Sequence, residues 1–214
     1  MVDFRYLTTL LFGALAFSIW SAAPVMAAQR GFDAAVLAEI NYARTHPAEY
    51  AESLREFRGS GGRYRQDDSD DDRYAPASYE GYSAIDEAVR FLQRQRPLAP
   101  LAGNDGLRRS ASGYAEEQGE TGNIGHTGYD GSSLSDRVHR NGVWSGYAAE
   151  AISYGQESAA AVVRQLIIDD GVASRGHRKT LFDPGLKVAG VGCGSHRTYR
   201  YMCVIDFAGA LVVR

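Results

Sequence analysis

Hydrophobic positions repeat at helical spacing over most of the first two thirds of the chain. Apolar residues recur three and four positions apart, which is the period of a helix that buries one face. The predicted helices cover 32–45, 47–57, 83–96, 104–118 and 158–169. Asp33, Ser83 and Ser158 can each cap a first turn. Pro47 suits the first turn of the second helix, because the residue before a proline is pushed out of the α region.

The pattern changes towards the C-terminus. Segments 143–154, 188–193 and 199–207 are rich in aromatic and β-branched residues and partly alternate, so they predict strands. The last two can pair as a hairpin centred on Thr198. Since helices come first and the clearest strands last, the order favours an α+β protein over a repeat of βαβ units.

Residues 58–82 interrupt this pattern with glycines, an acidic run and scattered arginines, which predicts a long solvated loop. Asp68, Asp70 and Asp72 match the first three ligands of a calcium loop. The sixth position, however, is Arg73 where glycine is required, and the twelfth is Tyr79 instead of glutamate. We therefore expect a solvated loop here and no calcium site.

The N-terminus has the features of an export signal. Arg5 precedes an apolar run from 7 to 20, and small or apolar residues stand before a cut after Ala27. The run is shorter than the ~20 residues that a membrane-spanning helix needs. An uncleaved anchor or a buried core helix are the alternatives. We expect residues 1–27 to be a cleaved signal peptide, which leaves a secreted or periplasmic protein that is not integral to the membrane.

The two cysteines fit an oxidising compartment. In a hairpin centred on Thr198, Cys193 and Cys203 face each other across the strands, where Cβ atoms lie ~4.5–5.5 Å apart. A disulfide is sterically allowed there and forms readily outside the cytosol. Two buried thiols are the alternative. No C-x-x-C is present, which argues against a zinc knuckle or a thioredoxin-type site.

Composition limits the classes of partner. The chain has 214 residues, 44% of them apolar, which suits one domain with a substantial core. The formal net charge of −3 provides no general attraction for nucleic acid, so we expect no nucleic-acid partner.

Three residues stand out as candidates for chemistry. Of the five histidines, His126 and His177 each follow a glycine, which allows close backbone packing and can direct the ring into a cleft. Glu150 lies in an apolar strand, where a buried carboxylate needs a cationic or hydrogen-bonding partner. The set suits a divalent-metal site, a base with an orienting acid, or a structural hydrogen-bond cluster. Its spacing alone favours none of these.

Several segments resemble the CAP superfamily, also called the SCP or sperm-coating-protein type. They are VLAEINYAR at 36–44, GH at 125–126 followed by DGS at 130–132, AEAISYG at 149–155, SRGHRKTLF at 174–182, and GVG at 190–192 followed by DFA at 206–208. They occur in the family order, and 58–82 is the only large unmatched segment. The resemblance implies a CAP domain over 28–214, built as a three-layer α-β-α sandwich around a central, mainly antiparallel sheet.

The resemblance also implies a common cleft. Carried over by motif, His126, Glu150 and His177 line it, with the two histidines as candidate ligands of a divalent metal such as zinc. The chain departs from the family at Ala151, where asparagine is usual, and a second family glutamate has no secure match. Asp169 or Asp170 precedes the second histidine at a suggestive place, so both are candidates for the cleft.

The resemblance implies a secreted binding module, with a divalent metal and a small lipid or cell-envelope component as ligands. A metal- or base-dependent hydrolase of peptides or cell-wall polymers is the alternative, with Glu150 and His177 as candidate catalytic residues. A purely structural cluster is the third. The chain has no G-x-S-x-G or H-E-x-x-H motif, which favours binding over catalysis.

Overall fold

The computed structural model describes residues 23–61 and 79–213 of the chain. The predicted signal peptide lies mostly outside this part, and so do Asp68, Asp70 and Asp72 of the calcium-loop alternative. The helices are α1 (Ala23–Thr45), α2 (Pro47–Gly59), α3 (Tyr82–Arg94), α4 (Asp105–Thr121), α5 (Leu134–His139), α6 (Ala159–Ile168) and α7 (Gly176–Leu181). The strands are β1 (Ala102–Gly103), β2 (Gly142–Tyr154), β3 (Val188–His196) and β4 (Arg200–Val213).

Local sequence signals account for several helix boundaries. The side chain of Asn104 accepts hydrogen bonds from the first turn of α4, and Ser158 does the same for α6. Two predicted caps are wrong. Ser83 lies inside α3, whose N-cap is Gly81, and Asp33 lies inside α1. The carboxylate of Asp33 instead accepts a hydrogen bond from the backbone of Cys193, a tertiary contact that no local pattern indicates.

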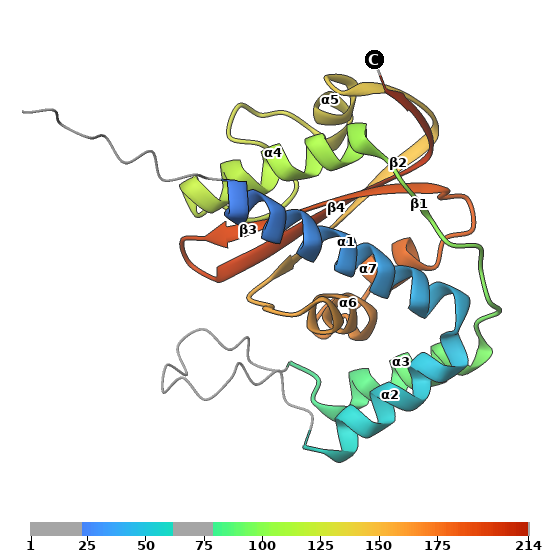
Figure 1. Cartoon of the computed structure of the whole chain (residues 1–214). Coiled ribbons are helices and arrows are strands. Elements are labelled where there is room, and N and C mark those ends of the chain that lie inside the picture. The colour runs from blue at the N-terminus through green and yellow to red at the C-terminus, as the bar shows by residue number, and fades with distance from the viewer. Residues whose placement is uncertain (1–22, 62–78, 214) are drawn as a thin grey trace, which may run out of the picture.

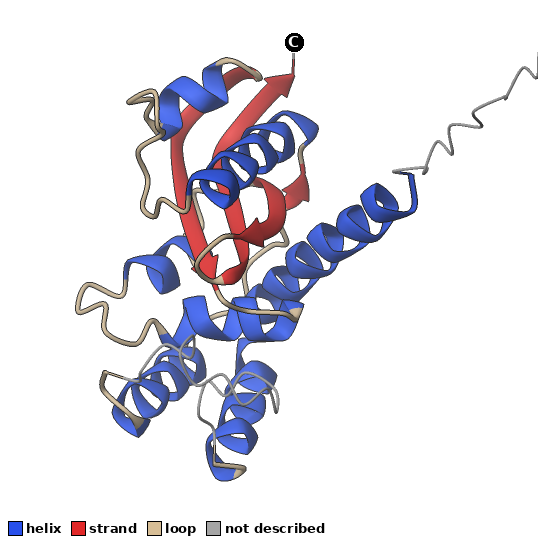
Figure 2. Ribbon diagram, turned by 90° about the vertical axis from the view of Figure 1, so that its left-hand side faces the viewer, coloured by secondary structure: helices blue, strands red, loops and turns tan. Residues whose placement is uncertain are grey.

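The strands form one sheet in the order β1-β3-β4-β2, with β1 parallel to β3 and the other pairs antiparallel. Helix α4 packs on one face, while α1 and α6 cover the other, and α2 and α3 lie beyond them (Figures 1 and 2). The predicted α-β-α sandwich is therefore confirmed.

Strand alternation separates two cores. Side chains such as Ala151, Val191 and Ile205 enter the large core under α1 and α6. Their neighbours one position away, including Ile152 and Val204, pack under α4. Glu150 and Asp206 share this second parity, so both point to the α4 face of the sheet.

The closing hairpin has the predicted register. Cys193 lies opposite Cys203, and the two form a disulfide. The expected bridge is therefore confirmed, and it fastens β3 to β4 in the middle of the sheet.

Two glycines of β3 let α4 approach the sheet closely. A Cβ at Gly190 would overlap the backbone of Leu107 and Arg108, and one at Gly192 would overlap the backbone of Ser112. Helix backbone cannot rotate away as a side chain can, so α4 itself would have to move.

We expect Gly190→Ala to lower the free energy of unfolding by about 1–3 kcal/mol, because the added methyl group overpacks a rigid contact. Urea unfolding measures this change. Gly194→Ala on the same strand is the matched control, since its Cβ would meet no atom within 4 Å. An equal loss in both variants would show that strand propensity, and not the approach of α4, limits these positions.

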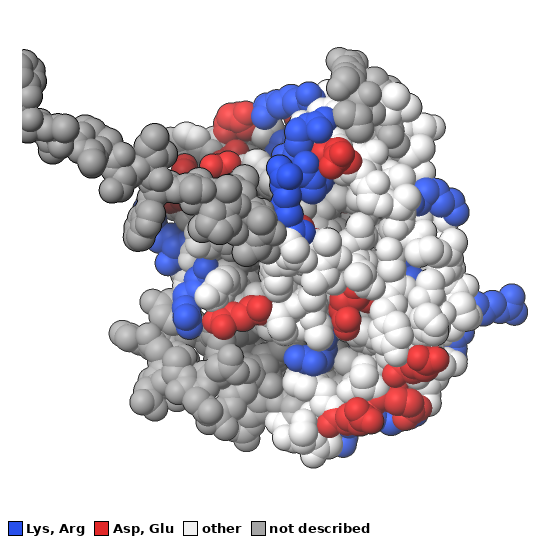
Figure 3. Space-filling view, viewed as in Figure 1, with Lys and Arg blue, Asp and Glu red and all other residues white. Residues whose placement is uncertain are grey.

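None of the helices among the described residues is both long and apolar enough to cross a membrane. Acidic and basic side chains are interspersed over the face seen in Figure 3.

Candidate ligand-binding site

Glu150 is the centre of one group of polar residues. Its side chain is only 2% exposed, on the face of β2 that α4 and α5 cover. One carboxylate oxygen lies 2.8 Å from Nδ1 of His126, and the other accepts a hydrogen bond of 2.7 Å from Arg137. The imidazole is 56% exposed, so this group runs from the interior to the surface. The structure thus brings together two of the three predicted residues.

Arg137 supplies the cation that the buried carboxylate requires. It lies on α5, which a capping box of Ser133 and Asp136 begins. Besides pairing with Glu150, it donates to the carbonyls of His126 and Ser132, and its guanidinium stacks 3.6 Å from the ring centre of Tyr114. The same side chain therefore neutralises Glu150 and holds the loop that carries His126.

The backbone before His126 is anchored from three sides. Gly125 has a φ of +98°, a conformation that L side chains rarely adopt. Its N–H donates to the hydroxyl of Tyr154, and its carbonyl accepts from Tyr114 and Gln118. The backbone conformation thus explains why a glycine stands before His126. Gly176, by contrast, is the first residue of α7 and has no positive φ.

Asp206 lies behind Glu150 and was missed by the sequence reasoning. The two residues are cross-strand partners of β2 and β4. Asp206 is fully buried, and neither carboxylate oxygen has a hydrogen-bond partner in good geometry, although Ser110 and Glu150 are close by. Burial raises the pKa of Asp206 well above its ordinary value, and the nearby charge of Glu150 raises it further. The signal that could have identified Asp206 is the presence of an aspartate inside an apolar strand.

His177 belongs to a second group. Its Nδ1 lies 2.7 Å from the carboxylate of Asp169, which also accepts a hydrogen bond from the His177 N–H. Asp169 caps the end of α6 in the left-handed conformation and is buried. Arg175, in the same turn, is left-handed as well. Two non-glycine residues in this conformation indicate a turn held by its surroundings.

Asp170 makes its hydrogen bonds elsewhere and not with either imidazole. Its carboxylate accepts hydrogen bonds from the N–H groups of Tyr79 and Glu80, where the chain returns from the loop. Of the two predicted aspartates, Asp169 alone contacts a predicted histidine.

An ion-pair network supports the turn before His177. Arg175 pairs with Glu80 and Glu87, and the buried Arg178 pairs with Glu87 and donates to two carbonyls at the end of α6. The hydrogen bonds from Arg175 lower the pKa of Glu80 to about 2. The sequence reasoning missed this network, because its members lie about 90 positions apart along the chain.

The two histidines share one chemical arrangement. A carboxylate can only accept, so Nδ1 of each neutral ring carries the proton and Nε2 keeps a lone pair for a ligand. Helix α7, which carries His177, packs against β2, which carries Glu150. In the described part of the chain, however, no three His, Cys, Asp or Glu side chains form a group that could hold a metal ion. The two imidazoles, each beside a carboxylate, therefore form two separate pairs in the described part of the chain.

The fold and these two pairs define an α-β-α sandwich domain with carboxylate-backed histidines beside its edge strand. The model of the cysteine-rich secretory protein family, CAP, matches residues 37–207. The chain belongs to this family.

Three solved structures of bacterial proteins match the chain. An extracellular protein containing an SCP domain from Bacillus anthracis is 20% identical, with a TM-score of 0.43 over 59% of this chain and 37% of that one. An outer surface protein from Borrelia burgdorferi is 19% identical, with a TM-score of 0.45 over 65% of this chain and 95% of that one. A cysteine-rich secretory protein from Staphylococcus aureus is 18% identical, with a TM-score of 0.39 over 60% and 38%.

The chain thus spans well under half of the Bacillus and Staphylococcus proteins. No curated protein matches it in sequence.

Proposed function

We propose that this protein is an exported CAP-type binding module that holds a divalent cation, such as zinc, between His126 and His177. The observation that carries the proposal is the pairing of each Nδ1 with a buried carboxylate. Histidines that bind metals almost always donate their other ring N–H to such a partner. Glu150 and Asp169 then orient the rings and raise their basicity, while water or a ligand completes the coordination.

Apolar side chains near His126 support a ligand with an apolar part, as in a lipid or a cell-envelope component. Ile124 is 60% exposed and Tyr129 is 80% exposed, and both lie on the loop that carries His126. Contiguous apolar patches at a surface mark binding sites, and two large apolar side chains on one short loop are a start for such a patch. The cation would then hold a polar or anionic head group beside them.

We expect protein recovered from the export compartment to bind one equivalent of Zn²⁺ in calorimetric titrations, and native mass spectrometry with elemental analysis to identify the retained metal and any lipid. Replacing both His126 and His177 with alanine abolishes uptake while the circular dichroism spectrum is kept. Glu150→Gln lowers the affinity for Zn²⁺ about 10–100-fold, as expected for a residue that orients a ligand. His46→Ala is the control, an exposed histidine at the junction of α1 and α2.

Two other results would contradict the proposal. A wild-type protein that never binds metal, combined with a double variant that unfolds, would show that the polar groups are structural. Turnover of a peptide or cell-wall polymer that disappears in Glu150→Gln would instead identify a hydrolase.

A further inference from the structure

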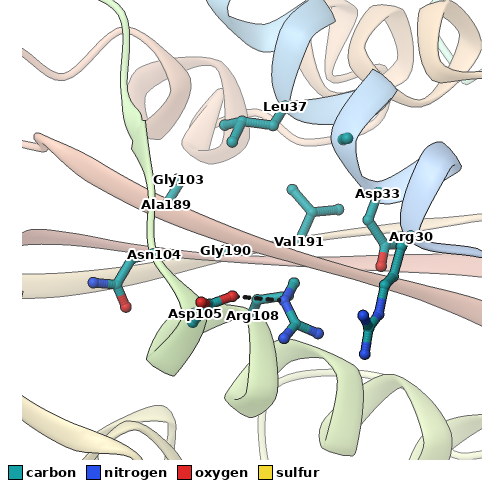
Figure 4. A pocket seen from close by; sticks show the side chains of 11 residues that line it. Arg30, Asp33, Leu37, Gly103, Asn104, Asp105, Arg108, Ala189, Gly190 and Val191 are labelled. Atoms are coloured by element: carbon teal, nitrogen blue, oxygen red, sulfur yellow. Dashed lines mark hydrogen bonds and ion pairs between the residues drawn. The ribbon is translucent and has the colours of Figure 1, made fainter. Parts of the chain in front are cut away.

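A cavity of about 330 Å³ lies at the β1–β3 side of the sheet, between α1 and the start of α4 (Figure 4). Ligand pockets in proteins span about 300–1,000 Å³, so this one suits a small ligand. Neither histidine pair lines it, and β2 lies at the other edge of the sheet.

The backbone of β3 is incompletely paired along this cavity. Strand β1 reaches only Ala189, whose carbonyl accepts the last hydrogen bond, from the N–H of Asn104. Further along, the N–H of Cys193 donates to the carboxylate of Asp33 over 3.0 Å. Alternate residues of an antiparallel strand direct their backbone polar groups to the same side. Val191, midway between these two, therefore turns its N–H and C=O away from β4, towards the cavity that it lines.

Within the described ranges, no hydrogen bond joins these two groups of Val191 to a side chain or to backbone outside the strands, and β1 ends before reaching them. Val191 is only 3% exposed, and buried backbone groups are nearly always paired. The missing partner is an acceptor and a donor in one extended unit, which is the chemistry of a peptide backbone.

Two arginines line the same cavity. Arg108 uses only its Nε, in an ion pair of 3.2 Å with Asp105, so its terminal nitrogens keep their hydrogen-bonding capacity. Arg30 has no hydrogen-bond or ion-pair partner in the part of the chain that is described. Figure 4 shows both side chains ending on the same side of β3. Like charges at one cavity repel each other, and an anion placed between them removes that repulsion.

The other residues that line the cavity favour a peptide over a simple anion as the ligand. Its two carboxylates are already engaged, Asp105 by the Nε of Arg108 and Asp33 by the Cys193 N–H, which leaves the terminal nitrogens of Arg108 for a ligand. Ala34 and Leu37 of α1 add an apolar wall. The cavity thus offers a strand edge, a cationic end and space for a small apolar side chain.

We propose that this cavity binds a short extended peptide by its C-terminal end. The peptide backbone adds to β3 by pairing with Val191, and the terminal carboxylate lies at Arg108 and Arg30. Both strand addition and capture of a terminal carboxylate are established modes of peptide recognition. This site goes beyond the proposed cation site and does not depend on it.

The test is a titration of ¹⁵N-labelled protein, recovered from the export compartment, with the tripeptide Ala-Leu-Ala. We expect saturable shifts of the amide signals of Gly190, Val191 and Gly192. The C-terminally amidated peptide binds about tenfold or more weakly, because it loses charge-assisted hydrogen bonds to arginine. Arg108→Gln weakens the free peptide to the same degree. Arg109→Gln, a neighbour on α4 that does not line the cavity, leaves the affinity unchanged.

Methylation of the peptide nitrogens, which removes the donors of strand pairing, is also expected to weaken binding about tenfold. Three results would overturn the proposal: equal affinity of the free and amidated peptides, shifts confined to the surroundings of His126, or no saturable shift at millimolar peptide. The same shifts with acetate alone at equal affinity would also overturn it, since they would show a simple anion site.

Discussion

Arg137→Ala is expected to lower the free energy of unfolding by about 3–5 kcal/mol, the cost of leaving a buried charge without its partner. Both the arginine and Glu150 are almost fully buried, so water cannot replace the lost ion pair. The substitution also removes the hydrogen bonds to the carbonyls of His126 and Ser132. Urea unfolding at pH 7 measures the change.

Arg140→Ala is the matched control on the same α5 region. Arg140 pairs with Asp130 at 3.0 Å, but both side chains are more than half exposed. Exposed pairs of this kind contribute about 0–1 kcal/mol. A loss in Arg137→Ala no larger than in Arg140→Ala would show that Glu150 is not held as a buried anion.

Asp206→Asn is expected to stabilise the protein at neutral and alkaline pH. In the folded protein the pKa of Asp206 is raised by burial and by Glu150, while in the unfolded chain it is about 3.9. The folded state therefore keeps a proton that the unfolded state releases. The contribution of this group to stability is complete below about pH 4 and is lost as the pH rises towards the folded-state pKa.

Between the two pKa values, the wild type loses about 1.4 kcal/mol of stability per pH unit from this group. Asparagine has a similar size but carries no titrating proton and no charge. The difference in stability between Asp206→Asn and wild type should therefore grow as the pH rises from 5 towards the folded-state pKa and then level off, as measured by urea unfolding at each pH.

Asp130→Asn is the control for titration, because hydrogen bonds from Ser132 lower the pKa of Asp130 to about 2. The stability that a group with a lowered pKa contributes is present at any pH above its unfolded-state pKa, and it is lost only in acid. Its difference from wild type should stay constant between pH 5 and pH 9. A difference that is equally flat for Asp206→Asn would contradict a protonated Asp206.

Much of the fold could be predicted because its signals are local. The helical period along 104–118 marked the residues of α4 that pack on the sheet. The midpoint of the closing hairpin predicted that Cys193 faces Cys203. Short elements were missed. β1 has two residues, and α5 and α7 have six each, which is too few for a period to be visible.

The candidate site was predictable in its residue types and only partly in its pairings. An aspartate or glutamate in an apolar strand signals a buried carboxylate, and that reasoning found Glu150. Applied to β4 it would also have found Asp206. Nothing in the sequence pattern indicated that Arg137, from a six-residue helix, supplies the positive charge for Glu150.

By itself, the sequence determined the longer helices, the closing hairpin with its disulfide and the family, and it proposed His126, Glu150 and His177 as candidate site residues. Each depends on spacing or on motifs within a few tens of residues. The tertiary structure decided which carboxylate meets which imidazole. A left-handed turn directs Asp169 to His177 and leaves Asp170 to the returning loop, while the register of β2 and β4 places Asp206 behind Glu150. Such pairings depend on how distant segments cross, and hydrophobic period carries no information about that.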